Sequence, residues 1–140
     1  MRTLTALLLA LPLAASAAPE APGDGAHAYT IESTKGPLKL KKGATSSVHV
    51  EVVPRADAHV SPDAPLSVLV SSGPALKPAK AKLVRADTHE TKAKGVEFDV
   101  PFTAEAAGKD EVKATVNFFI CTEKLCEKQK RDVTLAVLVE

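Results

Sequence analysis

The sequence predicts an all-β protein, an immunoglobulin-like antiparallel β-sandwich of about seven or eight strands. Three observations support this prediction. Apolar and polar residues alternate with a period of two along most of the chain, which is typical of strands that bury one face. Turn-forming residues separate short runs of β-prone residues. No segment shows the period of an amphipathic helix. The sandwich is expected to span residues 28–140.

The start of the chain predicts export. Arg2 is followed by an apolar stretch over residues 4–13 and then by small residues, which is the pattern of a secretory signal peptide. The small residues fit cleavage after Ala17, so residues 1–17 are the predicted signal peptide. Residues 18–27 are rich in Pro, Ala and Gly, and we expect them to form a flexible lead before the sandwich.

Eight segments carry the strand pattern and are separated by turn signals. They are residues 28–34, 37–43, 46–54, 64–74, 80–86, 95–104, 112–121 and 132–140. Alternation assigns one apolar face of the clearest segments to the core. The residues predicted to face inward are Val48, Val50, Val52, Leu66, Val68, Val70, Val96, Phe98 and Val100.

Charge and hydropathy exclude two classes of partner. The chain has 18 Lys and Arg against 17 Asp and Glu, and loss of Arg2 with the leader leaves the two signs equal. Nucleic-acid binding needs a basic footprint, so we predict no nucleic-acid partner. No apolar run of membrane length follows the leader, so no membrane span is predicted in the mature chain of about 123 residues.

Cys121 and Cys126, the two cysteines of the chain, are predicted to form a disulfide because exported proteins meet an oxidising environment. Extended chain would hold them about 16 Å apart, so bonding requires a hairpin whose loop is Thr-Glu-Lys-Leu, residues 122–125. The alternation from Val112 to Ile120 places Cys121 on the face away from the core, near a strand end, where we expect it to be accessible.

The hairpin register that follows from this pairing fits the core in one half only. Two cross-strand pairs suit a shared core: Val112 with Leu135, and Ala114 with Val133. Two others place an apolar residue opposite a polar one: Phe118 with Gln129, and Ile120 with Glu127. Either a bulge shifts the register near the tip or the strands do not pair there, and both possibilities stay open.

Two segments resemble a known family. The ending ATVNFFICTEKLCEKQKRDVTLAVLV and the stretch containing His59, Pro62 and Pro65 resemble the N-terminal periplasmic domain of the thiol:disulfide interchange protein DsbD and small secreted relatives of it. The similarity extends from about Tyr29 to Val139. Residues 127–129, Glu-Lys-Gln, differ from the aromatic and proline residues common there in the family.

The resemblance implies a periplasmic immunoglobulin-like domain in which Cys121 and Cys126 are the redox pair. It also implies periplasmic or membrane thiol–disulfide oxidoreductases as partners, because this chain has neither the transmembrane nor the thioredoxin-like domain of the interchange protein. Exchange requires a thiolate. Lys124, Lys128, Lys130 and Arg131 would favour it, whereas Glu123 and Glu127 would oppose it.

Two hypotheses about function follow. The chain either takes part in thiol–disulfide exchange or is a non-catalytic binding or structural domain with a structural disulfide. A metal site is not predicted, because the cysteines supply two ligands of the four that structural zinc needs. The four histidines are scattered far from the cysteines in the sequence: His27, His49, His59 and His89. No hydrolase or transferase pattern and no cofactor motif is present.

Overall fold

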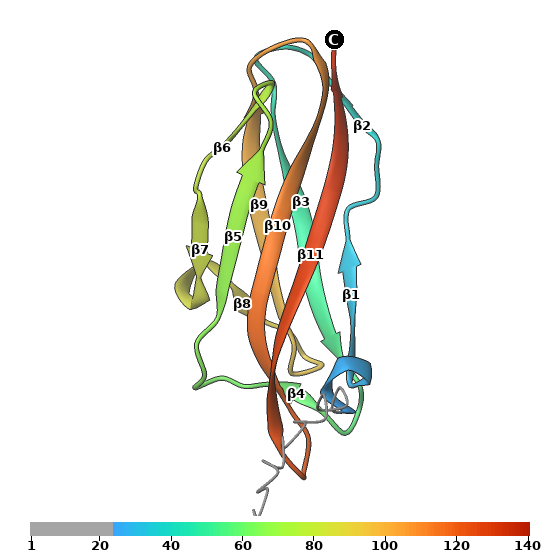
Figure 1. Cartoon of the computed structure of the whole chain (residues 1–140), viewed down its shortest axis with the longest axis vertical. Helices are drawn as coiled ribbons and strands as arrows, with labels where there is room; N and C mark the ends of the chain where they lie inside the picture. The colour runs from blue at the N-terminus through green and yellow to red at the C-terminus, as the bar shows by residue number, and fades with distance from the viewer. Residues whose placement is uncertain (1–23) are drawn as a thin grey trace, which may run out of the picture.

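The computed structural model of the chain describes residues 24–140. The predicted signal peptide and residues 18–23 of the predicted lead lie outside this range. The fold class is confirmed, because the described residues form two packed β-sheets of five and six strands (Figure 1). None of the helices in residues 24–140 is long and apolar enough to cross a membrane.

The first sheet, sheet A, has the strand order β1-β3-β9-β6, with β8 also paired to β9. Its strands are β1 (Tyr29–Ser33), β3 (Thr45–Pro54), β6 (Leu76–Pro78), β8 (His89–Glu90) and β9 (Val96–Ala104). The second sheet, sheet B, has the order β2-β11-β10-β5-β7, with β4 also paired to β10. Its strands are β2 (Leu38–Leu40), β4 (His59–Val60), β5 (Ser67–Ser72), β7 (Lys82–Val84), β10 (Gly108–Cys121) and β11 (Cys126–Val139).

Each of the eight predicted segments overlaps one strand, although β3, β10 and β11 begin earlier than predicted, and β4, β6 and β8 are additional. These three have only two or three residues each, which is too short for alternation to be recognised. One pairing departs from the antiparallel pattern, since β2 runs parallel to β11. Two 3-10 turns complete the fold, η1 (Asp24–His27) and η2 (Arg85–Asp87). The predicted lead thus ends in a turn that packs against β11.

The core lies between the sheets and is built from the predicted inward faces. Every residue predicted to face inward is at most 9% exposed, including Val70, the most exposed of them. Three of the four phenylalanines, Phe98, Phe102 and Phe118, are fully buried, and valine and leucine fill most of the remainder. The scarcity of aromatic residues is therefore met mainly by valine, whose β-branched side chain packs well on a pleated surface.

The β10–β11 hairpin dominates sheet B and ends in a tip that projects from one end of the sandwich (Figure 1). Its register runs without interruption from Gly108 opposite Val139 to Cys121 opposite Cys126. The predicted register is confirmed, and the question of a bulge is settled because the strands pair up to the tip.

Tyr29 explains how the ill-matched pairs near the tip are tolerated. Its ring packs edge-to-face on Phe118 with centroids 4.9 Å apart. Its hydroxyl donates to the side-chain oxygen of Gln129 at 3.1 Å and accepts from Nε of Arg131 at 2.6 Å. The Glu127 carboxylate accepts a hydrogen bond from the backbone N–H of Gly25 in η1. The inner face of β11 is thus polar where β1 and η1, not the core, cover it.

Candidate functional site

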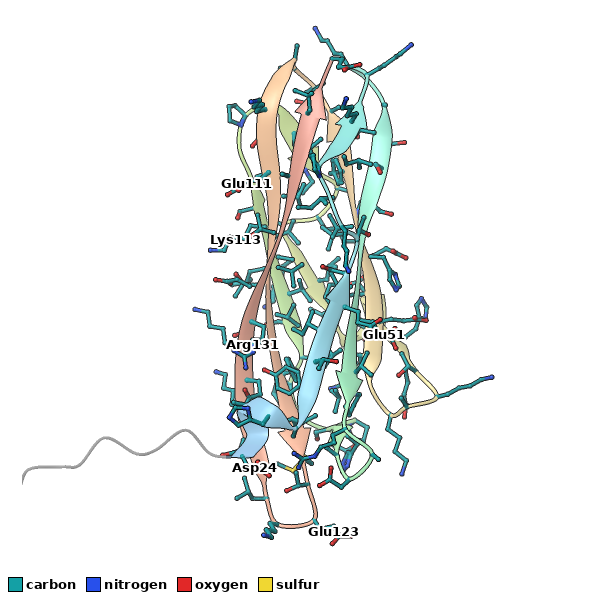
Figure 2. All side chains as sticks on the ribbon, turned by 90° about the vertical axis from the view of Figure 1, so that its right-hand side faces the viewer. Asp24, Glu51, Glu111, Lys113, Glu123 and Arg131 are labelled. Carbon is teal, nitrogen blue, oxygen red and sulfur yellow. A yellow bond between two sulfur atoms is a disulfide. The ribbon has the colours of Figure 1, made fainter. Side chains whose placement is uncertain are left out.

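The hairpin tip carries the predicted disulfide. Cys121 ends β10 and Cys126 begins β11, and the bonded pair has its Cα atoms 4.0 Å apart. The loop closes through a hydrogen bond of 2.9 Å from the backbone N–H of Thr122 to the carbonyl of Leu125. Neither cysteine is free. Asp24 and Glu123 lie at the same end of the molecule as the sulfur–sulfur bond (Figure 2).

The two cysteines differ sharply in exposure. Cys126 is exposed, whereas Cys121 is only 3% exposed. The prediction that Cys121 is accessible is therefore wrong, although it does lie on the outer face of the sheet. The end of β10 is not a sheet edge, because β4 pairs with it opposite β11 and is continued by a hydrogen bond from Ser61 N–H to the Phe119 carbonyl at 2.9 Å. Sequence alternation gives the face of a residue but not what covers that face.

The β4 strand also places a histidine beside the buried cysteine. His59 lies directly opposite Cys121, and Cys126 lies opposite Cys121 on its other side. Directly opposite residues of antiparallel strands share a face, with Cβ atoms about 4.5–5.5 Å apart. His59, Cys121 and Cys126 thus form a row across three strands. Sequence reasoning missed this neighbour because His59 and Cys121 are far apart in the chain and β4 has two residues.

The hairpin register also sorts the charges predicted to act on the pair. Lys128 and Lys130 share the outer face of the disulfide, because they alternate with Cys126 along β11. Glu127 and Arg131 are on the inner face, where Gly25 and Tyr29 bind them. Among the charged residues of β11 nearest the tip, those on the disulfide face are therefore cationic.

The inner-face contacts anchor the base of the tip. Burial raises the pKa of the Tyr29 phenol, and the hydrogen bond from Arg131 partly opposes this rise.

A second anchor joins η1 to the turn after β3, where Nη2 of Arg55 contacts Asp57 at 3.0 Å and Asp24 at 3.3 Å. The hydrogen bond from Arg55 lowers the pKa of the Asp57 carboxyl. A small pocket of about 150 Å³ lies between this anchor and the loop at Glu123.

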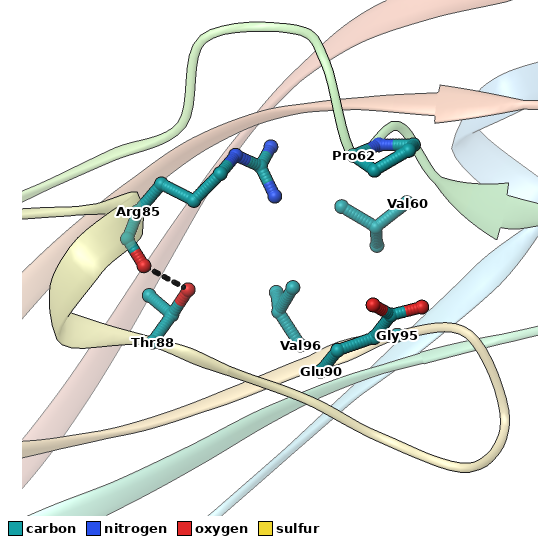
Figure 3. Close-up of a pocket in the computed structure, with 7 residues that line it drawn as sticks. All are labelled: Val60, Pro62, Arg85, Thr88, Glu90, Gly95 and Val96. Carbon is teal, nitrogen blue, oxygen red and sulfur yellow. Dashed lines mark hydrogen bonds between the residues drawn. The ribbon is translucent and has the colours of Figure 1, made fainter.

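A second pocket, of about 220 Å³, lies beside β4 and is lined by Val60, Arg85 and Glu90 among others (Figure 3). Nη2 of Arg85 donates to the carbonyls of Ser61 and Ala64 at 2.7 and 2.8 Å. The guanidinium therefore fixes the loop after β4, so its role here is structural. The pocket is also smaller than the roughly 300–1,000 Å³ usual for small-molecule sites.

One group of metal-ligating side chains occurs in the described residues, on the outer face of sheet A. His49 and Glu51 of β3 and Glu97 of β9 have ligand atoms within 4.8 Å of one another. The sequence pattern predicts no metal site, and His49 is only one of four scattered histidines there. The cross-strand neighbours that surround it come from the β3–β9 register, which the sequence pattern did not provide.

No family model matches the chain, and no curated protein sequence matches it. Solved structures are similar in fold only. The trypsin-activated alpha-2-macroglobulin of Escherichia coli shares 14% identity over 79% of this chain, with a TM-score of 0.49, and the match covers 7% of that much longer chain. The AggA fimbrial subunit of Escherichia coli shares 12% identity over 80% of this chain and 94% of its own, with a TM-score of 0.41. A PapD-like domain of human CEP192 shares 12% over 94% of this chain and 97% of its own, with a TM-score of 0.39.

Proposed function

We propose that this chain is an exported domain, similar to the N-terminal domain of DsbD, that exchanges disulfides with thiol proteins of the cell envelope through Cys121 and Cys126. The observation that carries the proposal is the asymmetry of the pair: Cys126 is exposed at a projecting tip, and Cys121 is buried directly beside it. An exchange centre needs one sulfur that a partner can reach and a second thiol held close to resolve the mixed disulfide.

The proposed reaction begins at Cys126. A thiolate of a reduced partner attacks the Cys126 sulfur, a bond forms between the two proteins, and Cys121 leaves as a thiolate. A second thiolate of the partner then attacks the partner's own sulfur in the mixed disulfide and releases the Cys126 thiolate. The partner has lost two electrons and carries the new disulfide, while this chain has gained two electrons and takes up protons on its thiols. The reverse sequence passes the electrons to an oxidised partner.

The surroundings of the pair favour this direction of attack. The leaving Cys121 thiolate would form beside His59, and a protonated imidazole stabilises a neighbouring thiolate. Lys128 and Lys130 on the same face add positive charge near Cys126. Leu125, in the loop next to Cys126, is 53% exposed and offers an apolar contact to a docking partner.

The alternative is a non-catalytic domain in which the disulfide only stabilises the hairpin. The burial of Cys121 favours it, because a buried sulfur is protected from reductants. Two facts weigh against it. A ring of this size stabilises by only about 2 kcal/mol. The strands it joins are already paired along their whole length.

Trapping with single-cysteine variants tests the proposal. Cys121→Ser leaves the exposed thiol without its resolving partner, so it should accumulate mixed disulfides with envelope proteins, detectable on non-reducing gels and by mass spectrometry. Cys126→Ser leaves only the buried thiol and should trap several-fold less. This expectation reverses the one from sequence alone, in which Cys121 was the accessible sulfur.

A matched control separates specific trapping from the reactivity of any exposed thiol. In a variant with both cysteines replaced by Ser, Thr134→Cys places one thiol at an exposed position of β11 away from the tip. It should not capture the same partners. Absence of trapped protein in Cys121→Ser, or the same set of proteins in the control, would contradict the proposal and favour the structural disulfide.

A further inference from the structure

A row of acidic side chains crosses the outer face of sheet A. Glu51 of β3 lies directly opposite Glu32 of β1 on one side and Glu97 of β9 on the other. Directly opposite residues share a face, and like charges in such pairs destabilise a sheet. Among the ion pairs of residues 24–140, none includes Glu32 or Glu51, and Glu97 is paired with His49 alone. The row is therefore without a basic Lys or Arg partner.

His49 is held beside this row by a fourth carboxylate, that of Asp99. Its Nδ1 lies 3.1 Å from Oδ1 of Asp99, the residue directly opposite it on β9. If Nδ1 carries the proton and donates to Asp99, Nε2 keeps its lone pair, and Oε2 of Glu97 lies 3.9 Å from it. That distance is too long for a hydrogen bond. A carboxylate that binds the far nitrogen of a histidine is the usual partner of a metal-bound imidazole.

The spacing of the three ligand atoms suits one ion. The nearest nitrogen of His49 and carboxylate oxygens of Glu51 and Glu97 lie within 4.8 Å of one another. Around a tetrahedral zinc ion with bonds of about 2.0–2.1 Å, ligand atoms are about 3.3 Å apart. His49 and Glu97 are 49% and 41% exposed, so small side-chain rotations can close the difference without moving the strands. Glu51 projects from the sandwich on the side away from Lys113 and Arg131 (Figure 2).

We propose that His49, Glu51 and Glu97 bind one divalent transition-metal ion of the zinc class, with Asp99 as the positioning residue for His49. One imidazole nitrogen and two carboxylate oxygens suit zinc and its neighbours, whereas calcium requires six to eight oxygen ligands. The ion would neutralise the acidic row and join β3 to β9. Three protein ligands leave a fourth position for water.

Calorimetric titration of the chelator-treated protein with zinc chloride tests the site. The protein is kept oxidised and free of reductant, because released thiolates bind zinc themselves. The expected result is one zinc ion per chain and no binding of calcium chloride at the same concentration. His49→Ala and Glu97→Gln should each weaken zinc binding at least about tenfold, and Asp99→Asn should weaken it by a similar factor. His27→Ala, which removes an exposed imidazole in η1, should leave it unchanged.

The melting temperature of Glu51→Gln gives a second test, because zinc should reverse the sign of its difference from the wild-type melting temperature. Without metal the variant should melt at a higher temperature than the wild type, because two like-charge pairs are removed. With saturating zinc the order should reverse, because only the wild type gains stability from binding. Zinc binding by His49→Ala at wild-type strength, no binding by the wild type at millimolar zinc, or an unchanged order of melting temperatures would overturn the proposal.

Discussion

Cys121 and Cys126 are bonded to each other, yet they differ in exposure and in neighbouring residues. Cys126 is exposed at the tip, and Cys121 is buried on a strand that lies between β4 and β11. In thiol–disulfide exchange, the partner must be able to reach the attacked sulfur, and the leaving sulfur must be stabilised as a thiolate. Under the proposed function, Cys126 would be the attacked sulfur and His59 would lie beside the leaving Cys121 thiolate, in one row across three strands. A stabilising effect of His59 on the Cys121 thiolate is expected from the exchange proposal and not from a purely structural disulfide.

We predict that His59→Ala slows reduction of the disulfide by a small dithiol about fivefold, because the imidazole opposite Cys121 no longer stabilises the leaving thiolate. A positive charge about 5 Å from the leaving thiolate is worth about 1 kcal/mol when it is screened as strongly as in bulk water. Stopped-flow measurement of the reduction rate checks this. His59→Lys should restore most of the rate, and His89→Ala, on β8, should leave it unchanged. Equal reduction rates for all variants would show that His59 does not stabilise the leaving thiolate and would contradict this prediction.

At the scale of elements, the hairpin depends on contacts that it does not itself supply. The inner face of β11 is apolar from Val133 to Val139 and polar from Glu127 to Arg131. The polar part is stable against the sandwich because η1 and Tyr29 provide hydrogen-bond partners for it. The projecting tip is thus held by a segment about 100 residues earlier in the chain, as the separation of Tyr29 and Gln129 shows.

Tyr29→Phe should therefore lower the free energy of unfolding by about 1 kcal/mol at neutral pH, because the hydroxyl contacts to Gln129 and Arg131 are lost. The pH dependence has a definite sign. Burial raises the folded-state pKa of Tyr29 above its ordinary value of 10.0, so its stabilisation is complete below pH 10 and is lost as pH rises further. Denaturant unfolding above pH 10 should show a steeper loss for the wild type than for the variant. Parallel losses would contradict this assignment.

The limits of sequence reasoning are clearest at the same elements. Alternation and the cysteine pair were enough to predict the register of β10 and β11, because each pattern constrains the other. They did not predict why Ile120 can lie opposite Glu127, since the answer is Gly25, a partner from the other end of the chain. The position of Cys121 directly opposite His59 depends on β4, whose two residues carry no recognisable period.

At the scale of the whole molecule, the core and the disulfide are separate. The buried cluster that fills the sandwich includes Phe98, Phe118 and Leu135 but not Cys121, although Cys121 is buried. The cross-link closes a short ring at one end and joins strands that pair without it. The sandwich should therefore remain folded when the pair is reduced, which an exchange protein requires because it must function in both states.

The equilibrium reduction potential of the Cys121–Cys126 pair tests this account most directly. It is measured by equilibrating the protein with a thiol–disulfide buffer of known ratio, alkylating free thiols and counting them by intact mass, while circular dichroism monitors the fold. We expect a value within the range of exchange proteins, about −120 to −270 mV, with the β-sandwich retained in the reduced form. A potential below about −300 mV, or unfolding on reduction, would show that the bond is structural and would contradict the exchange function.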